Sequence, residues 1–284
     1  MKLKSSFALL ALLSLNACSE EEHGTATFTT WGEEYIEEGI PADDGGFVDG
    51  WSLKYDKFLV NFHRIQVASA DGEMAGTAPE SYFVDNTVPG RKQLISFEDI
   101  EAKAWDRVSY QIKPAVADAK IVAGDSADLE MMVDAGYSIY IQGSATNGDV
   151  TKTFALGFQT ATQYEECHSE QSGKDTAGIV ITDGSEDTSE LTTHGDHFFY
   201  DRLQGSAGSS VETSLRFDEV AAADDNGDAD GDITAEELEN QPLNVKLYDP
   251  SGLPAANMKD FMTGLARTVG HFRGEGECTI SEAE

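Results

Sequence analysis

Hydrophobic and polar residues alternate along several stretches between residues 25 and 204, and this two-residue period is typical of β-strands with one buried face. The clearest alternation runs along residues 51–62. Its inward positions are predicted to be Trp51, Leu53, Tyr55, Phe58, Val60 and Phe62. The phase changes after Tyr55 and again before Ile65, so bulges or breaks are expected within these strands.

A β-hairpin is predicted over residues 137–158. Apolar residues alternate toward Asn147-Gly148 on one side and away from it on the other, and this dipeptide readily adopts the positive φ angles of a tight turn. Further strand candidates lie at residues 108–112 and 179–181. Together these segments indicate an antiparallel sheet protein that most simply closes as a β-sandwich.

The pattern changes after residues 205–210, a run of small residues that we interpret as a link. Phe217, Val220 and Ala221 recur at helical spacing, which predicts a helix leading into an acidic stretch. The next helix is expected to be short, because Pro242 stops it.

A strand and a helix are predicted in the C-terminal part. Val245 and Leu247 indicate the strand, and Asn257 is a suitable N-cap for a helix that ends near Gly270. The buried face of this helix is expected to contain Met258, Phe261, Met262, Leu265 and Val269.

The first residues have the features of a secretion signal. Two lysines are followed by an apolar run at 7–15 that is too short to span a bilayer. The next residues, "LNAC" at 15–18, resemble the lipobox of bacterial lipoproteins, although Asn16 departs from the small or hydroxyl residue usual there. The resemblance implies that Cys18 is lipidated and becomes the mature N-terminus. The alternative is an ordinary signal peptide cleaved near Ala17, with Cys18 left free.

The residues after Cys18 and the overall charge bear on location and partners. Ser19 resembles the sorting signal of outer-membrane lipoproteins, which implies a lipid-anchored envelope protein on the periplasmic face or the cell surface. The formal net charge of −33 argues against nucleic acid as a partner and against unassisted binding to anionic lipid. Membrane contact is therefore expected through the N-terminal lipid.

Two further cysteines, Cys167 and Cys278, remain once Cys18 is assigned to lipid. An even pair in an oxidising compartment most simply forms one disulfide, and the alternative is two unpaired buried thiols. A disulfide would attach the C-terminal region to the β region, so that both belong to one domain.

The acidic stretch "NGDADGDITAEE" at 226–237 resembles the EF-hand calcium loop. Gly231 falls at the sixth position, where the loop bends sharply, and Ile233 at the apolar eighth position. The ligand positions one, three, five, seven, nine and twelve hold Asn226, Asp228, Asp230, Asp232, Thr234 and Glu237. The resemblance implies one Ca²⁺ site, in which the last residue binds with both carboxylate oxygens.

Two features set this loop apart from a calcium sensor. Asn226 replaces the usual aspartate and removes a charge, which Asp224 or Asp225 could compensate from the outer shell. No second loop is recognisable, because the nearest candidate, 183–194, has Thr188 where glycine is required. A lone loop is similar to the structural calcium sites of secreted bacterial proteins, and the alternative is an acidic turn that binds no specific ion.

The expected organisation follows from these features. Residues 1–17 form a signal peptide, 18–30 the lipidated N-terminus and tether, 31–210 a β-sandwich-like region, 211–242 the EF-hand-like calcium-binding insert, and 243–284 a C-terminal strand and helix packed on the β region. The predicted fold class is mainly β: an antiparallel β-sandwich-like domain with a helical insert and a C-terminal helix.

A second metal site is suggested by the segment "HGDHFFYD" at 194–201. His194 and His197 are three residues apart and can present two imidazoles to one Zn²⁺ or Cu²⁺ ion. Candidates that could complete the site are His63, His168 and His271. The alternative is that one histidine bonds locally while the aromatic residues 198–200 enter the core.

No catalytic motif is recognisable, including the nucleophile elbow, the zinc-protease helix and the phosphate-binding loop. Our first hypothesis is a calcium-stabilised, lipid-anchored envelope protein that acts as a binding or structural module for a protein or glycan ligand. The second is a periplasmic copper- or zinc-binding protein that uses His194 and His197. The third is a secreted hydrolase of unfamiliar type.

Overall fold

The computed structural model describes residues 22–42, 45–203 and 213–283. The signal segment, the lipidation candidate Cys18 and the predicted link at 205–210 lie outside the described residues. The fold is mainly β, with two curled sheets and few helices, which confirms the predicted class.

The smaller sheet has four strands in the order β16-β14-β1-β4. Their bounds are β1 His23–Trp31, β4 Lys92–Glu101, β14 Glu186–Thr193 and β16 Gly270–Phe272. Strand β1 pairs with β14 in parallel, from Thr25 opposite Glu186 to Trp31 opposite Thr192. This parallel pair is an exception to the expected antiparallel pairing, and the long intervening chain supplies the crossover that a parallel pair requires.

The larger sheet follows the order β15-β9-β8-β2-β6-β10-β17, with β3 on the other edge of β2 and β7 beside β3. The bounds are β2 Ser52–Ala68, β3 Met74–Asp85, β6 Arg107–Ile112, β7 Lys120–Ala123, β8 Ile139–Asn147, β9 Val150–Phe158, β10 Thr162–Glu165, β15 Asp232–Ile233 and β17 Thr279–Glu282. Its register shifts between Tyr55 and Lys57 and between His63 and Gln66, which are the places where the alternation changes phase. Two short ribbons complete the β structure: β5 Ala104–Trp105 with β13 Ile179–Val180, and β11 His168–Gln171 with β12 Lys174–Ala177.

The predicted hairpin is formed by β8 and β9, paired from Ile139 opposite Phe158 to Asn147 opposite Val150. Gly148 adopts a φ of +59°, as its place in a tight turn requires. Asn147 stays in the strand, so the turn lies one residue later than the dipeptide suggested.

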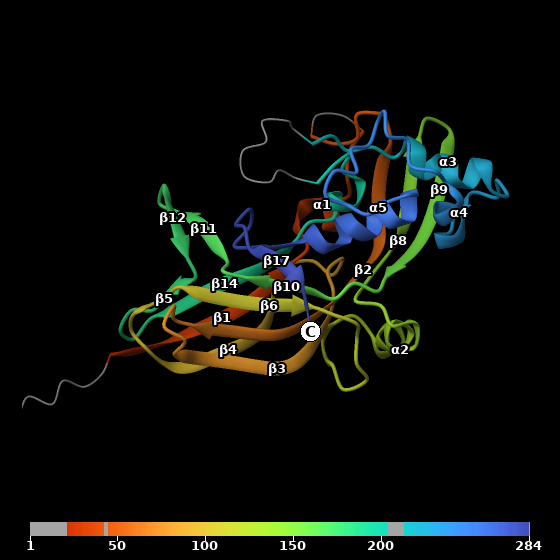
Figure 1. Ribbon diagram of the computed structural model, residues 1–284. Coiled ribbons are helices and arrows are strands. Elements are labelled where there is room, and N and C mark those ends of the chain that lie inside the picture. The colour runs from red at the N-terminus through yellow and green to blue at the C-terminus, as the bar shows by residue number, and fades with distance from the viewer. Residues whose placement is uncertain (1–21, 43–44, 204–212, 284) are drawn as a thin grey trace, which may run out of the picture.

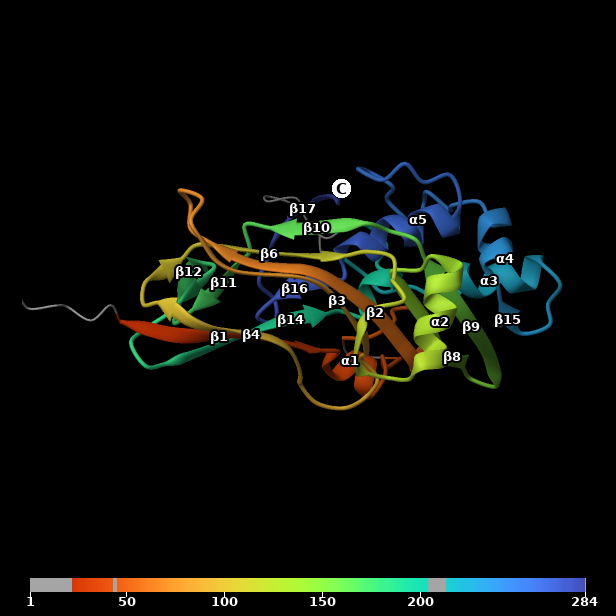
Figure 2. The ribbon, with the colours of Figure 1, turned by 90° about the horizontal axis from the view of Figure 1, so that it is seen from below.

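One hydrophobic core fills the space between the sheets, which form two layers in Figure 2. Phe28 and Leu191 enter it from the smaller sheet, and Phe62 and Val108 enter it from the larger sheet. The aromatic run at 198–200 is also buried in this core, as one of the sequence alternatives expected.

Helices lie at the rim of the sheets (Figure 1). The α-helices are α1 Glu33–Glu37, α2 Ser126–Ala135, α3 Asp218–Asn226, α4 Ala235–Asn240 and α5 Met258–Leu265, and the 3₁₀-helices are η1 Asp196–Phe199 and η2 Ala266–Thr268. Across the described ranges, no helix combines the length and apolar character needed to cross a membrane.

Helix α2 was not expected in the β region. Asp125 caps its first turn by accepting a hydrogen bond from the Asp128 amide, and Gly136 ends it in the left-handed conformation. Leu129 and Met132 pack with a small second cluster on the outside of the large sheet. The cap and the glycine are sequence signals that could have identified this helix.

The C-terminal part differs from the prediction at one strand. Residues 244–247 form a turn, in which the Leu247 amide donates to the Asn244 carbonyl at 2.9 Å, and Val245 is 70% exposed. The predicted strand there is wrong, because two alternating apolar residues are too few to define a buried face. The helix capped by Asn257 is present as α5, followed by η2.

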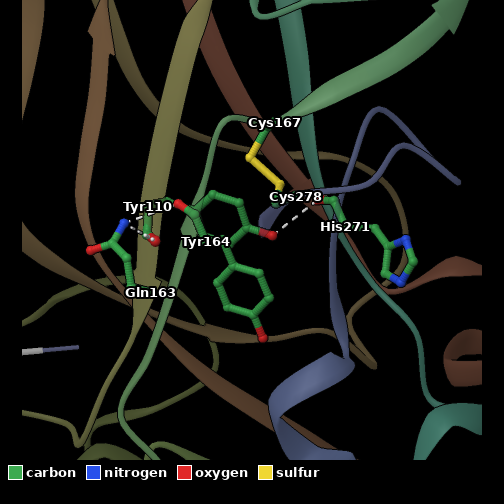
Figure 3. The surroundings of a disulfide bond; sticks show 6 residues. All are labelled: Tyr110, Gln163, Tyr164, Cys167, His271 and Cys278. Carbon is green, nitrogen blue, oxygen red and sulfur yellow. Dashed lines mark hydrogen bonds between the residues drawn. A yellow bond between two sulfur atoms is a disulfide. The ribbon is translucent and has the colours of Figure 1, made fainter. Parts of the chain in front are cut away.

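A disulfide joins Cys167 and Cys278, as predicted, across 111 residues of sequence (Figure 3). The rings of Tyr110 and Tyr164 stack beside it with centroids 4.6 Å apart. The Tyr110 hydroxyl donates to the backbone carbonyl of His271 at 3.1 Å. The disulfide therefore attaches the C-terminal segment to the connection between β10 and β11.

Candidate metal centre

Three buried histidines, His194, His197 and His271, lie together at one end of the small sheet; we call them the histidine cluster. Their ring centroids are 4.2 Å apart for His194 and His271, 5.1 Å for His194 and His197, and 5.0 Å for His197 and His271. His194 directly follows β14, and β16 places His271 opposite Thr192. The pairing of β14 with β16 therefore selects His271 from the three candidates that could complete the site.

The other two candidates lie elsewhere. His63 sits on β2 opposite Gln111 of β6. The Nδ1 atom of His168 contacts Asp175 Oδ1 at 2.6 Å on the β11–β12 ribbon. Neither histidine belongs to the cluster.

Gly195 allows the chain to turn between the first two histidines. A Cβ atom at this position would lie 2.6 Å from Cγ1 of Ile36, too close for any larger residue. The Tyr55 hydroxyl donates to the Gly195 carbonyl at 2.5 Å. This packing fixes where His194 and His197 enter the cluster.

The hydrogen bonds of Thr268 define the tautomer of His197. The Thr268 hydroxyl donates to the Leu265 carbonyl at 2.8 Å, so it accepts a hydrogen bond from Nδ1 of His197 at 3.0 Å. The Nε2 atom of His197 then carries a free lone pair, the form in which imidazole binds a metal.

Glu33 approaches His194 from α1, with its Oε2 atom 3.2 Å from Nδ1 of the histidine. Its backbone φ of +55° is unusual for a glutamate, and such strain is common at functional sites. Burial, followed by the negative charges of Glu275, Asp196 and Glu190, raises the pKa of Glu33 to about 8.

Among the described residues, the buried atoms without a hydrogen-bond partner include Nδ1 of His271 and Oδ1 of Asp196. The other oxygen of Asp196 accepts a hydrogen bond from the Tyr200 hydroxyl at 2.8 Å. Burial raises the pKa of Asp196, whereas burial and the neighbouring imidazoles lower the pKa of His271 to about 2 and that of His197 well below its usual value. Unpartnered buried polar atoms of this kind are rare in proteins.

The donors form two overlapping groups whose ligand atoms lie within 4.8 Å of one another. One contains His194, His271 and Glu275, and the other contains His194, Asp196 and His197. A Zn²⁺ ion with bonds of about 2.1 Å holds its ligand atoms about 3.5 Å apart, so small side-chain movements suffice to bring the donors to one ion. The chemistry available is the binding of a divalent metal through nitrogen and oxygen.

The predicted calcium loop lies at the opposite end of the molecule from β1, between α3 and α4 (Figure 1). Gly231 adopts a φ of +98° at the expected bend, and Ile233 is buried. Thr234 and Glu237 form a capping box at the start of α4. Glu237 Oε1 also accepts a hydrogen bond from the Asp228 amide at 3.4 Å.

The loop brings together part of the predicted ligand set. Oxygen atoms of Asp228 and Glu237 lie within 4.8 Å of each other and of Asp224, which was not among the six expected ligands. The side chain of Asn226 turns away and donates to Gln241 Oε1 at 2.9 Å. Asp224 instead accepts a hydrogen bond from the Gly231 amide at 3.1 Å.

The remaining expected ligands are less gathered. Asp230 accepts from the Asp232 amide at 2.8 Å, and Asp228 accepts from the Asp230 amide at 3.2 Å. A buried lysine, Lys152 of β9, contacts both Asp224 and Asp225. Lys152 therefore already places a positive charge beside the carboxylates at the start of the loop.

Comparison with known proteins gives no functional lead. No family model matches this chain, and searches of the curated proteins and of the solved structures found no match. The assignment of function therefore depends on the chemistry of the histidine cluster and of the calcium loop.

Proposed function

We propose that this chain is a cell-envelope protein that binds one divalent transition metal, Zn²⁺ or Cu²⁺, at the histidine cluster. The observation that carries the proposal is the convergence of three buried imidazoles, with centroids 4.2–5.1 Å apart, from two distant segments of the chain, 194–197 and 270–272. Imidazole nitrogen is a preferred ligand of both metals, whereas Ca²⁺ and Mg²⁺ prefer oxygen.

The charges around the cluster support a cation. Glu33, Asp196 and Glu275 surround the three imidazoles, and among the ion pairs of the described residues none joins these carboxylates to a lysine or arginine. Asp196 is buried and Glu33 is largely buried, and burying a carboxylate without a compensating cation is costly. A bound metal would neutralise them and would give partners to His271 and Asp196.

The test is metal titration of the soluble protein from Ser19 onward after chelator treatment. We expect one Zn²⁺ or Cu²⁺ per chain by calorimetry and by elemental analysis. The double variant His197→Ala, His271→Ala should lose binding, whereas the matched control His63→Ala, His168→Ala should retain it. Absence of binding, or equal binding by both variants, would overturn the proposal.

Calcium binding at residues 226–237 is the second candidate function. It is favoured by the preformed bend at Gly231, the buried Ile233 and the positioned Glu237 carboxylate. Ca²⁺ here would stabilise the fold by tying α3 to α4. Titration with Ca²⁺ and then Mg²⁺, together with thermal unfolding, tests this: one-site Ca²⁺ binding with a raised melting temperature supports it, and no binding up to millimolar Ca²⁺ counts against it.

We also propose that lipid on Cys18 anchors the chain at the outer membrane, where it meets a protein or glycan partner. The support is the sequence pattern at 15–18 and the serine that follows. Cys18→Ala should move the protein from the membrane fraction to the soluble fraction. Continued membrane association of that variant would contradict lipid anchoring.

A further inference from the structure

Glu275 is the exposed member of the donor groups that contain the histidine cluster. It lies on the turn that follows β16, and its ligand oxygen is within 4.8 Å of ligand atoms from His194 and His271. The imidazoles and Asp196 are buried, and the side chain of Glu33 is 19% exposed. Glu275 thus stands between solvent and the buried nitrogen atoms.

The backbone of this turn is held at several points. The Phe272 amide donates to the Gly276 carbonyl at 2.9 Å, and the Arg273 amide donates to the Glu190 carbonyl at 2.8 Å. The Gly274 amide donates to the Thr192 hydroxyl at 2.9 Å. Because the disulfide at Cys278 follows immediately, freedom to move resides in the Glu275 side chain and not in the turn.

The Gly274 carbonyl connects the turn to the cluster, since it accepts from Nε2 of His194 at 3.4 Å. Arg273 adopts a φ of +55°, and its guanidinium contacts Asp187 and Ser189. That positive charge is therefore engaged with the side of β14, which leaves the Glu275 carboxylate free to attract a cation.

We propose that Glu275 is the outer ligand of the histidine cluster: it captures a hydrated Zn²⁺ or Cu²⁺ ion at the surface and transfers it to His194 and His271. The inference rests on the function proposed above. An exposed carboxylate can bind an ion that still carries its water ligands. The ion then loses these waters one at a time as imidazole nitrogens replace them, so its desolvation is divided into smaller steps. The carboxylate then remains as the oxygen ligand on the solvent side.

The test is stopped-flow kinetics of Zn²⁺ association, and of Zn²⁺ release to a chelator, on the otherwise unchanged soluble chain. Glu275→Gln keeps the size of the side chain and removes its charge. We expect it to slow association on the order of tenfold at low ionic strength and to weaken the salt dependence of the rate. Release to the chelator should also become faster, on the order of tenfold.

Glu277→Gln is the matched control. Glu277 is exposed, lies two residues further on, and shares its pocket with Arg267 and Cys278 instead of the cluster. Wild-type kinetics are expected for this variant. If Glu275→Gln changes release alone, Glu275 is an ordinary ligand and the capture role is wrong; if it changes neither rate, Glu275 is no ligand at all. If the wild-type chain binds no Zn²⁺ or Cu²⁺, the function proposed for the cluster fails first.

Discussion

The calcium loop and the histidine cluster are built in opposite ways. The loop is a continuous segment and is largely exposed. Its carboxylates already have partners in the chain: Lys152 forms ion pairs with some of them, and backbone amides donate hydrogen bonds to others. The three imidazoles of the cluster come from η1, from the residue after β14 and from β16, and they are buried; carboxylates from α1, from η1 and from the turn after β16 surround them. Among the described ion pairs, no lysine or arginine meets its carboxylates.

This difference predicts different responses to metal removal. In the loop, Gly231 and the Thr234–Glu237 capping box hold the backbone by local contacts, so its shape does not require an ion. In the cluster, Nδ1 of His271 and Oδ1 of Asp196 lack partners without an ion. A metal ion is therefore expected to bind the loop without changing its backbone. At the cluster, a metal ion is expected to supply the partners that the buried polar atoms lack.

Removal of the disulfide should have the largest effect and should separate the two regions. Cys167→Ser with Cys278→Ser opens a loop of 111 residues, and chain entropy alone predicts a loss of about 4.7 kcal/mol in the free energy of unfolding. Because Cys278 anchors the turn that carries Glu275, Zn²⁺ affinity should fall while Ca²⁺ affinity stays unchanged. Denaturant unfolding and two calorimetric titrations check this. A parallel loss of both affinities would show that the regions are not independent.

Lys152→Met should be the next most damaging change. It leaves the buried carboxylate of Asp224 without its cation, which is expected to cost about 3 kcal/mol in calcium-free buffer. Added Ca²⁺ should recover part of this loss by replacing the ammonium charge. Lys54→Met, at an exposed position on β2, is the control and should change stability little. An equal loss of stability with and without Ca²⁺ would show that Ca²⁺ does not replace the charge of Lys152.

The ligand residues of the loop can be ranked against each other. Glu237→Gln removes a charged ligand and should weaken Ca²⁺ binding at least about tenfold, equivalent to about 1.4 kcal/mol. Thr234→Ala should weaken Ca²⁺ binding less, although it removes the N-cap of α4. Calorimetry with Ca²⁺ distinguishes the variants, and equal affinities would mean that the assigned register is wrong.

The smallest effect expected is the pH dependence of the chelator-treated protein between pH 4.5 and pH 6.5, because two contributions oppose each other in this range. His271 has a pKa of about 2 in the folded state and 6.5 as its ordinary value, so the unfolded state binds more protons and stability falls as the pH drops below 6.5. Glu33 has a pKa of about 8 against 4.5, so the folded state binds more protons and stability falls as the pH rises from 4.5 through 8. Maximum stability is expected where the two ranges overlap, from pH 4.5 to pH 6.5.

The matched variant for the alkaline side is Glu33→Gln, which cannot ionise. Its melting temperature should no longer decline between pH 6.5 and pH 8, whereas the acidic decline should remain. Thermal unfolding across the pH series measures both sides. An unchanged alkaline decline in this variant would show that another group causes it.

The features predicted from sequence are those that short segments encode. Alternation around Gly148 predicted the β8–β9 hairpin, and the Asn257 cap with its apolar face predicted α5. The bend at Gly231 is equally local. The disulfide between Cys167 and Cys278 is the exception: its cysteines are 111 residues apart, and the number of cysteines together with the expected oxidising compartment predicted their pairing.

The features that escaped prediction depend on distant segments. His271 joins His197 only because β14 pairs with β16, and no spacing within the chain specifies that pairing. Glu33 and Glu275 belong to no sequence motif, and the chain has 52 acidic residues. The sequence therefore could not predict that these two glutamates lie beside the imidazoles. Asp224 is a local exception: it was expected only in the outer shell, because the loop motif counts its ligand positions from Asn226.

The parallel pairing of β1 with β14 has a consequence for how the chain folds. The Thr30 hydroxyl donates to the Leu191 carbonyl across 161 residues, so β1 cannot complete its pairing with β14 until the chain has been made that far, although its other partner, β4, is much nearer in sequence. Contacts of such long range slow folding, because loop closure must precede any gain from packing. A chain synthesised from its N-terminus could pair β1 with β4 early, but the other edge of β1 would stay open until β14 has been made.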